Sequence, residues 1–102
     1  MIYGIIYEYV DILSGFSAYV GKASSLYGFE SMARIVQRRH LRGRDPVPFD
    51  MRLRERPDNY RFVVLIELVA HSGHVLQRVL KPMEKEYVRG RDPMHNVVRF
   101  SS

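Results

Sequence analysis

The sequence predicts an α/β domain of the α+β type, with a small antiparallel three-stranded sheet flanked by helices. Three segments are rich in β-branched and aromatic residues, as strands are, and turn residues separate the first two. Between and after them, apolar residues recur at helical spacing. The length of 102 residues suits one compact core, so we expect a single domain over residues 1–102.

The first two strands are expected to form a hairpin. Residues 2–11 have strand composition, Ser14-Gly15 supplies a turn, and the strand pattern resumes at residues 18–20 before a loop over residues 24–28. Alternation along the first strand places its odd positions on one face. Tyr7 therefore shares a face with other aromatic residues.

Two helices are expected next. The first begins near Glu30 and ends at Gly43 and Pro46, since glycine and proline stop helices. A shorter one follows over residues 49–56.

A third strand and a last helix complete the expected fold. Residues 60–70 are almost continuously apolar, which predicts a strand covered on both faces. Ser72-Gly73 turns the chain into a helical region over residues 75–89, which we expect Pro82 to interrupt.

Composition excludes several classes of protein. Because the chain has no cysteine, it can form neither a disulfide scaffold nor a thiolate zinc site. Glu67 interrupts the longest apolar run, and no basic leader opens the chain. We expect a soluble, uncleaved, cytoplasmic protein that does not bind membranes and is nucleoid-associated if its host is bacterial.

The positive charge is concentrated in the middle of the chain. Residues 34–61 hold nine arginines against four acidic residues, and so carry the whole net charge of +5. Forked guanidinium groups suit phosphate recognition, so the segment predicts a nucleic-acid-binding surface. We name as this arginine surface Arg38, Arg39, Arg42, Arg44, Arg52 and Arg54. The alternative is a solvated helical surface held by salt bridges.

One acidic residue stands out in the last helix. Glu84 lies on the same helical stripe as Leu80, Tyr87 and Val88. A carboxylate on an apolar stripe needs a partner, and a hard cation such as Mg²⁺, or Mn²⁺, is one candidate. A glutamate at the rim, paired with an arginine, is the other.

Three groups of residues resemble the GIY-YIG nuclease superfamily. Gly4-Ile5-Ile6-Tyr7 and Tyr19-Val20-Gly21-Lys22 resemble the two halves of its signature, and Leu80 to Glu84, followed by Pro93 and Asn96, is similar to its closing pattern. The segment from His40 to Glu67 looks like the middle of many standalone members. The resemblance covers residues 3–97 and implies a standalone catalytic domain of that family.

The resemblance implies roles for five residues. Tyr7 would help to activate the attacking water, Tyr19 would position water or phosphate, and Lys22 would assist beside them. Glu84 would hold one divalent metal ion, and Asn96 would support the site by hydrogen bonding. Because a free tyrosine has a pKa of about 10, we expect the metal and Lys22 to lower the pKa of Tyr7.

The family also places an arginine and an accessory residue on the first helix. We assign the arginine, which would stabilise charge on the phosphate, to Arg34. Arg38 or His40 then takes the accessory place. The spacing from Tyr7 to Tyr19 is one residue longer than is commonest in the family, which a bulge or looser turn would absorb.

The sequence therefore predicts a divalent-metal-dependent DNA endonuclease that hydrolyses phosphodiester bonds. Its specificity is expected to be low, or to follow DNA structure, as in repair or recombination, with a homodimer or a separate partner as sources of selectivity. The alternatives are a catalytically silent nucleic-acid-binding module and an interaction domain for acidic proteins.

Overall fold

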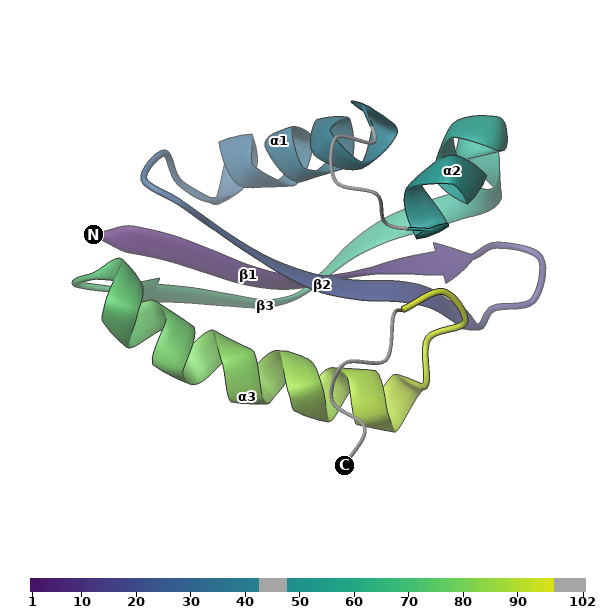
Figure 1. Ribbon diagram of the computed structural model, residues 1–102. Helices are drawn as coiled ribbons and strands as arrows, with labels where there is room; N and C mark the ends of the chain where they lie inside the picture. The colour runs from purple at the N-terminus through teal and green to yellow at the C-terminus, as the bar shows by residue number, and fades with distance from the viewer. Residues whose placement is uncertain (43–47, 97–102) are drawn as a thin grey trace.

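The computed structural model describes residues 1–42 and 48–96, which fold around one antiparallel sheet. Its strands are β1 (Ile2–Asp11), β2 (Ser17–Ser25) and β3 (Tyr60–Ala70), in the order β2-β1-β3. Helices α1 (Phe29–Arg42) and α2 (Pro48–Glu55) cover one face, α3 (Gly73–Arg91) covers the other, and a short 3₁₀ helix, η1 (Pro57–Asn59), leads into β3 (Figure 1). The predicted α+β architecture of three antiparallel strands flanked by helices is confirmed.

Alternation along the central strand β1 divides the core between the two faces. Ile5 and Tyr7 pack with Met32 and Val36 of α1, and Tyr9 packs with Phe49 of α2. The even position Ile6 packs against α3 through Leu76 and Leu80. The predicted aromatic face of β1 is therefore confirmed, and it is the face that α1 and α2 cover.

A bulge interrupts the strand pairing near the end of the first hairpin. Tyr9 pairs with Tyr19, whereas the next residue, Val10, pairs with Ser17, so Ala18 has no opposite partner. The irregularity lies beyond the paired residues Tyr7 and Gly21, whose register it leaves intact. Of the bulge and the looser turn that the sequence left open, the structure has a bulge.

The third strand does not have the predicted cover on both faces. β3 lies at an edge of the sheet, none of its side chains is fully buried, and Val64 and Val69 are exposed. The run of apolar residues in β3 therefore does not mark a central strand, because its side chains are only partly covered and the strand lies at the edge of the sheet. At the other edge, β2 extends through Ser24 and Ser25, which the sequence had suggested were part of a loop.

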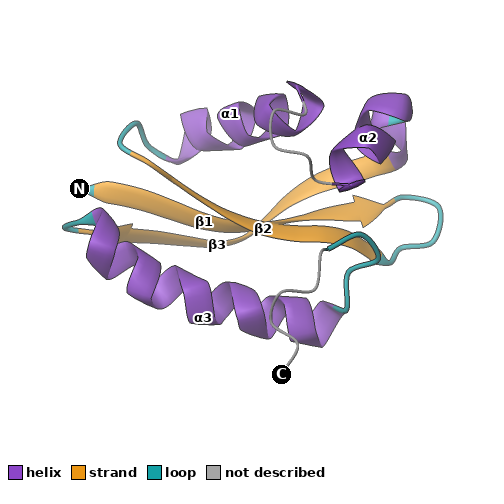
Figure 2. Cartoon of the chain, viewed as in Figure 1, coloured by secondary structure: helices purple, strands orange, loops and turns teal. Residues whose placement is uncertain are grey.

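Helix α3 is also more continuous than predicted, because it passes through Pro82 without a break (Figure 2). Pro82 and Arg78, one turn earlier, are both exposed. Water can therefore satisfy the Arg78 carbonyl that loses its helical partner at the proline. The helix ends at Arg91 and is capped by Asp92, which takes the left-handed conformation with φ of 45°. None of the helices in the described residues has the length and apolar character needed to cross a membrane.

Candidate active site

Tyr7 lies at the centre of the candidate site, on the face of the sheet beneath α1. Its ring stacks with that of Tyr19 at a centroid distance of 6.3 Å and packs against Phe62 at 5.3 Å. The ring also lies over Gly21 of β2, where a Cβ atom would be 2.5 Å from the Tyr7 hydroxyl. Only glycine at position 21 lets the Tyr7 ring lie this close to β2. The segment around Tyr7 and the segment around Gly21, which carry the two halves of the motif, are therefore in direct contact.

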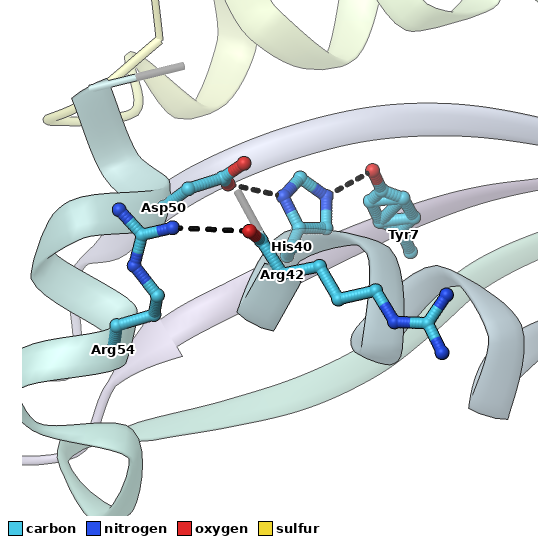
Figure 3. Close-up of polar contacts among 5 residues, drawn as sticks. All are labelled: Tyr7, His40, Arg42, Asp50 and Arg54. Atoms are coloured by element: carbon cyan, nitrogen blue, oxygen red, sulfur yellow. Dashed lines mark hydrogen bonds and ion pairs between the residues drawn. The ribbon is translucent and has the colours of Figure 1, made fainter. Parts of the chain in front are cut away.

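The Tyr7 hydroxyl contacts His40, which in turn contacts Asp50, so the three side chains form a chain of hydrogen bonds (Figure 3). It lies 2.6 Å from Nε2 of His40, and Nδ1 of the same ring lies 2.5 Å from Oδ1 of Asp50. His40 belongs to the last turn of α1 and Asp50 to the first turn of α2, and both are buried. The sequence had left the accessory place to Arg38 or His40; in the structure it is His40 that contacts Tyr7.

The surroundings of Tyr7 raise its pKa well above the ordinary value of 10.0. Burial is the largest cause, the neighbouring Tyr19, Tyr9 and Glu84 add to it, and Arg39 opposes it. The expectation that the site lowers this pKa through Lys22 is therefore wrong for the protein by itself. Tyr7 is a neutral phenol, because burial disfavours its charged form.

Glu84 and Lys22 lie on the opposite face of the sheet, towards α3. Glu84 is half-buried, and burial raises the pKa of its carboxyl above 4.5, while the nearby Lys22 lowers it. Lys22 Nζ donates to Oε1 of Gln77 at 2.9 Å. Within the described residues Glu84 forms no ion pair, so the alternative of a rim glutamate paired with an arginine finds no support.

Asn96 attaches the end of the described chain to β2. Its side-chain Oδ1 accepts from the Val20 amide, and its Nδ2 donates to the Val20 carbonyl, both at 2.8 Å. The backbone of Met94 and His95 donates to Ser17 and Ala18 of the same strand. Asn96 thereby fixes β2 at Val20, next to Tyr19.

The predicted arginines lie at the surface of α1 and α2. Arg34 and Arg38 are exposed on α1, and the structure shows no contact between them and Tyr7. Of the arginine surface, the exposed and described members are Arg38, Arg39, Arg42, Arg52 and Arg54, whereas Arg44 lies outside the described residues. Arg54 Nη1 donates to the Arg42 carbonyl at 3.2 Å and so ties the end of α1 to α2 (Figure 3).

Sequence reasoning missed Asp50 and a hollow beside the site. The signal for Asp50 was its place between Phe49 and Leu53, which both point into the core. The hollow, of about 250 Å³, lies between the end of β2 and α1, with Arg39 on its wall. It is lined by Ala23, Ser24, Ser25, Leu26, Tyr27, Met32, Ile35, Val36 and Arg39.

Comparisons with protein-family models, with curated proteins and with solved structures found no match to this chain.

Proposed function

We propose that the protein is a divalent-metal-dependent DNA endonuclease of the GIY-YIG kind that hydrolyses phosphodiester bonds. The observation that supports this most is the arrangement around Tyr7. Tyr19 stacks on it and His40 bonds to its hydroxyl, while Glu84, on the α3 side of the sheet, adds to its raised pKa. Tyr19 and His40, which are distant from each other in the chain, thus both contact the Tyr7 side chain.

Glu84 is the residue that fits a metal ion. It is a half-buried carboxylate that lacks an ion pair among the described residues and whose charged form is disfavoured by burial. Among the described residues, no three His, Cys, Asp or Glu side chains gather into a metal-holding group. Glu84 is therefore the single protein ligand proposed, and Mg²⁺ or Mn²⁺ held there would neutralise charge that develops on the phosphate.

The neutral state of Tyr7 defines how it can act. A phenol with a raised pKa is a poor base by itself, but its oxygen can accept a proton from water while its own proton passes to His40. Tyr19, whose ring stacks on that of Tyr7, would position the water or the phosphate. Arg34 would stabilise charge on the phosphate, after the approach of DNA to the surface of α1.

The arginine surface supports DNA as the partner, since it offers several exposed guanidinium groups on adjacent helices. Selectivity would then come from DNA structure, from a homodimer or from a separate partner.

A catalytically silent nucleic-acid-binding module is the second candidate. The near-complete burial of Tyr7, with 4% of its surface exposed, favours it, because a catalytic hydroxyl must reach water.

One experiment distinguishes the endonuclease from the catalytically silent nucleic-acid-binding module. Purified protein is mixed with supercoiled, branched and single-stranded DNA in Mg²⁺, in Mn²⁺ or in EDTA. A nuclease nicks or cuts in the metal ions, is blocked by EDTA, and loses cleavage but not DNA affinity on Glu84→Ala. The proposal fails if wild type and Glu84→Ala behave alike on every substrate.

A further inference from the structure

We propose that Asp50 is a positioning residue, which holds the His40 ring with its proton on Nδ1 so that Nε2 accepts the proton of Tyr7. The contribution of Asp50 to catalysis rests on the proposed nuclease function. Its effect on the ring does not, because this follows from contacts within the chain.

With the Asp50 carboxylate ionised and the His40 ring neutral, the two contacts of the ring determine which nitrogen carries its proton. An ionised carboxylate can only accept hydrogen bonds, so the contact of 2.5 Å with Asp50 requires a hydrogen on Nδ1. A neutral ring then has a lone pair on Nε2. The Tyr7 hydroxyl, 2.6 Å away, must donate to it. Asp50 thus sets the direction of the Tyr7 hydrogen bond through the ring.

Burial makes Asp50 the group on which the ring depends. His40 is 8% exposed and Asp50 is 4% exposed, so bulk water has little access to either. Tyr19 and Phe49 pack on the ring edge to face, with centroids 5.1 and 6.1 Å from it. These aromatic rings fix the plane of the imidazole but cannot select which nitrogen carries the proton. The carboxylate makes that selection.

The hydrogen bonds from Tyr7 to His40 and from His40 to Asp50 also give a route for the protons that move during hydrolysis. As the water oxygen bonds to phosphorus, the water proton moves to Tyr7 Oη and the Tyr7 proton moves to His40 Nε2. The bond from phosphorus to the leaving oxygen breaks, and that oxygen takes a proton from solvent. The imidazolium is stabilised by the Asp50 carboxylate and returns its proton to solvent afterwards.

The test compares wild type with Asp50→Asn, with Glu55→Gln as the matched control. Glu55 is an exposed acid on the same helix, so its change to an amide leaves the site untouched. ¹⁵N NMR of the His40 ring reports which nitrogen is protonated. We expect a proton on Nδ1 in wild type and Glu55→Gln, and loss of that preference in Asp50→Asn, whose amide can donate to the ring. Cleavage by Asp50→Asn should fall by about 100-fold or more, the lower end of what general acid–base catalysis contributes.

The outcomes separate the two proposals. A wild-type ring protonated on Nε2, or an Asp50→Asn ring unchanged from wild type, would overturn the role of Asp50 whatever the activity. If Asp50→Asn does not fold, as circular dichroism would show, the wild-type spectrum still decides. If wild type cuts DNA and a folded Asp50→Asn cuts equally fast, Asp50 is not a positioning residue, although the nuclease function stands. If the ring behaves as expected and wild type cuts nothing, only the nuclease function fails.

Discussion

At the scale of single residues, the proposed chemistry depends on the charge state of Glu84, because this carboxyl must ionise to hold a metal ion. Burial raises the pKa of its carboxyl above 4.5, so the folded protein binds this proton more tightly than the unfolded chain does. Between that ordinary value and the raised one, the folded state therefore holds more protons. Its stability falls as the pH rises through this window, because the buried carboxyl must ionise.

A glutamine at this position avoids that cost. We expect Glu84→Gln to unfold at a higher temperature than wild type at neutral pH in EDTA. The difference should vanish as the pH falls below about 4.5, where both side chains are neutral. Thermal unfolding across this pH range tests it, with Glu86→Gln on the exposed side of α3 as the control. A Glu84→Gln protein less stable than wild type at neutral pH would contradict the assigned burial of the carboxylate.

Some site residues could be predicted from the sequence and others could not. The strand pattern was enough to place Tyr7 on an aromatic face, and helical spacing was enough to turn Glu84 towards the sheet. The hydrogen bonds from Tyr7 to His40 and from His40 to Asp50 join three separate elements. The periodicity of residues within one helix or strand carries no information on how that element packs against others. The sequence pattern therefore predicted no role for Asp50.

The direction of the Tyr7 pKa shift was mispredicted for a related reason. The expectation counted charges, in the form of a metal and Lys22, but not the aromatic rings that enclose the hydroxyl. Desolvation depends on packing by side chains from several elements, and here it exceeds every charge effect on Tyr7. The raised pKa is what makes His40 necessary to the proposed mechanism.

At the scale of elements, α3 shows why a proline need not end a helix. Its inner side is held to the sheet by Leu76 and Leu80, on the turns before the proline, and by Tyr87 and Val88 after it. Packing on both sides of Pro82 stabilises the helix enough to offset the missing hydrogen bond. Sequence rules recognise the proline but not the compensating contacts, which explains the predicted interruption.

Replacing this proline should stabilise the protein. Because proline inside a helix is about 3 kcal/mol less favourable than alanine, and Pro82 is exposed, we expect Pro82→Ala to raise the free energy of unfolding by about 1–3 kcal/mol. Urea denaturation measures the change. Lys81→Ala, at the neighbouring exposed position, is the control and should shift stability by less than about 0.5 kcal/mol. Equal or lower stability of Pro82→Ala would show that the helix relies on the proline.

At the scale of the whole molecule, α1 and α2 cover one face of the sheet and α3 covers the other (Figure 1). The described members of the arginine surface lie on α1 and α2, whereas Glu84 belongs to α3 and Lys22 bonds to Gln77 of α3. The fold class and the concentration of charge were predicted from composition and pattern alone. The edge position of β3 was not, because strand order depends on pairing between strands that are distant in sequence.

The placement of the arginine surface on α1 and α2 predicts which arginines bind DNA. Arg42→Ala and Arg52→Ala should each weaken DNA binding and reduce its salt dependence by about one ion, because each guanidinium displaces counterions from phosphate. Arg78→Ala removes the same charge from the exposed side of α3 and serves as the matched control. Affinity measured by fluorescence anisotropy over a range of salt concentrations gives both quantities. Equal effects of all three substitutions would mean that only the net charge matters, and that α1 and α2 form no DNA surface.

The most direct test of the nuclease proposal is the rate at which wild type and Glu84→Ala nick supercoiled DNA in Mg²⁺, measured where both proteins bind it equally. We predict that wild type nicks the DNA and that Glu84→Ala is slower by about 100-fold or more, since it lacks the proposed metal ligand. Equal rates in the two proteins, or no metal-dependent nicking by wild type, would contradict the proposal that this chain is a metal-dependent endonuclease.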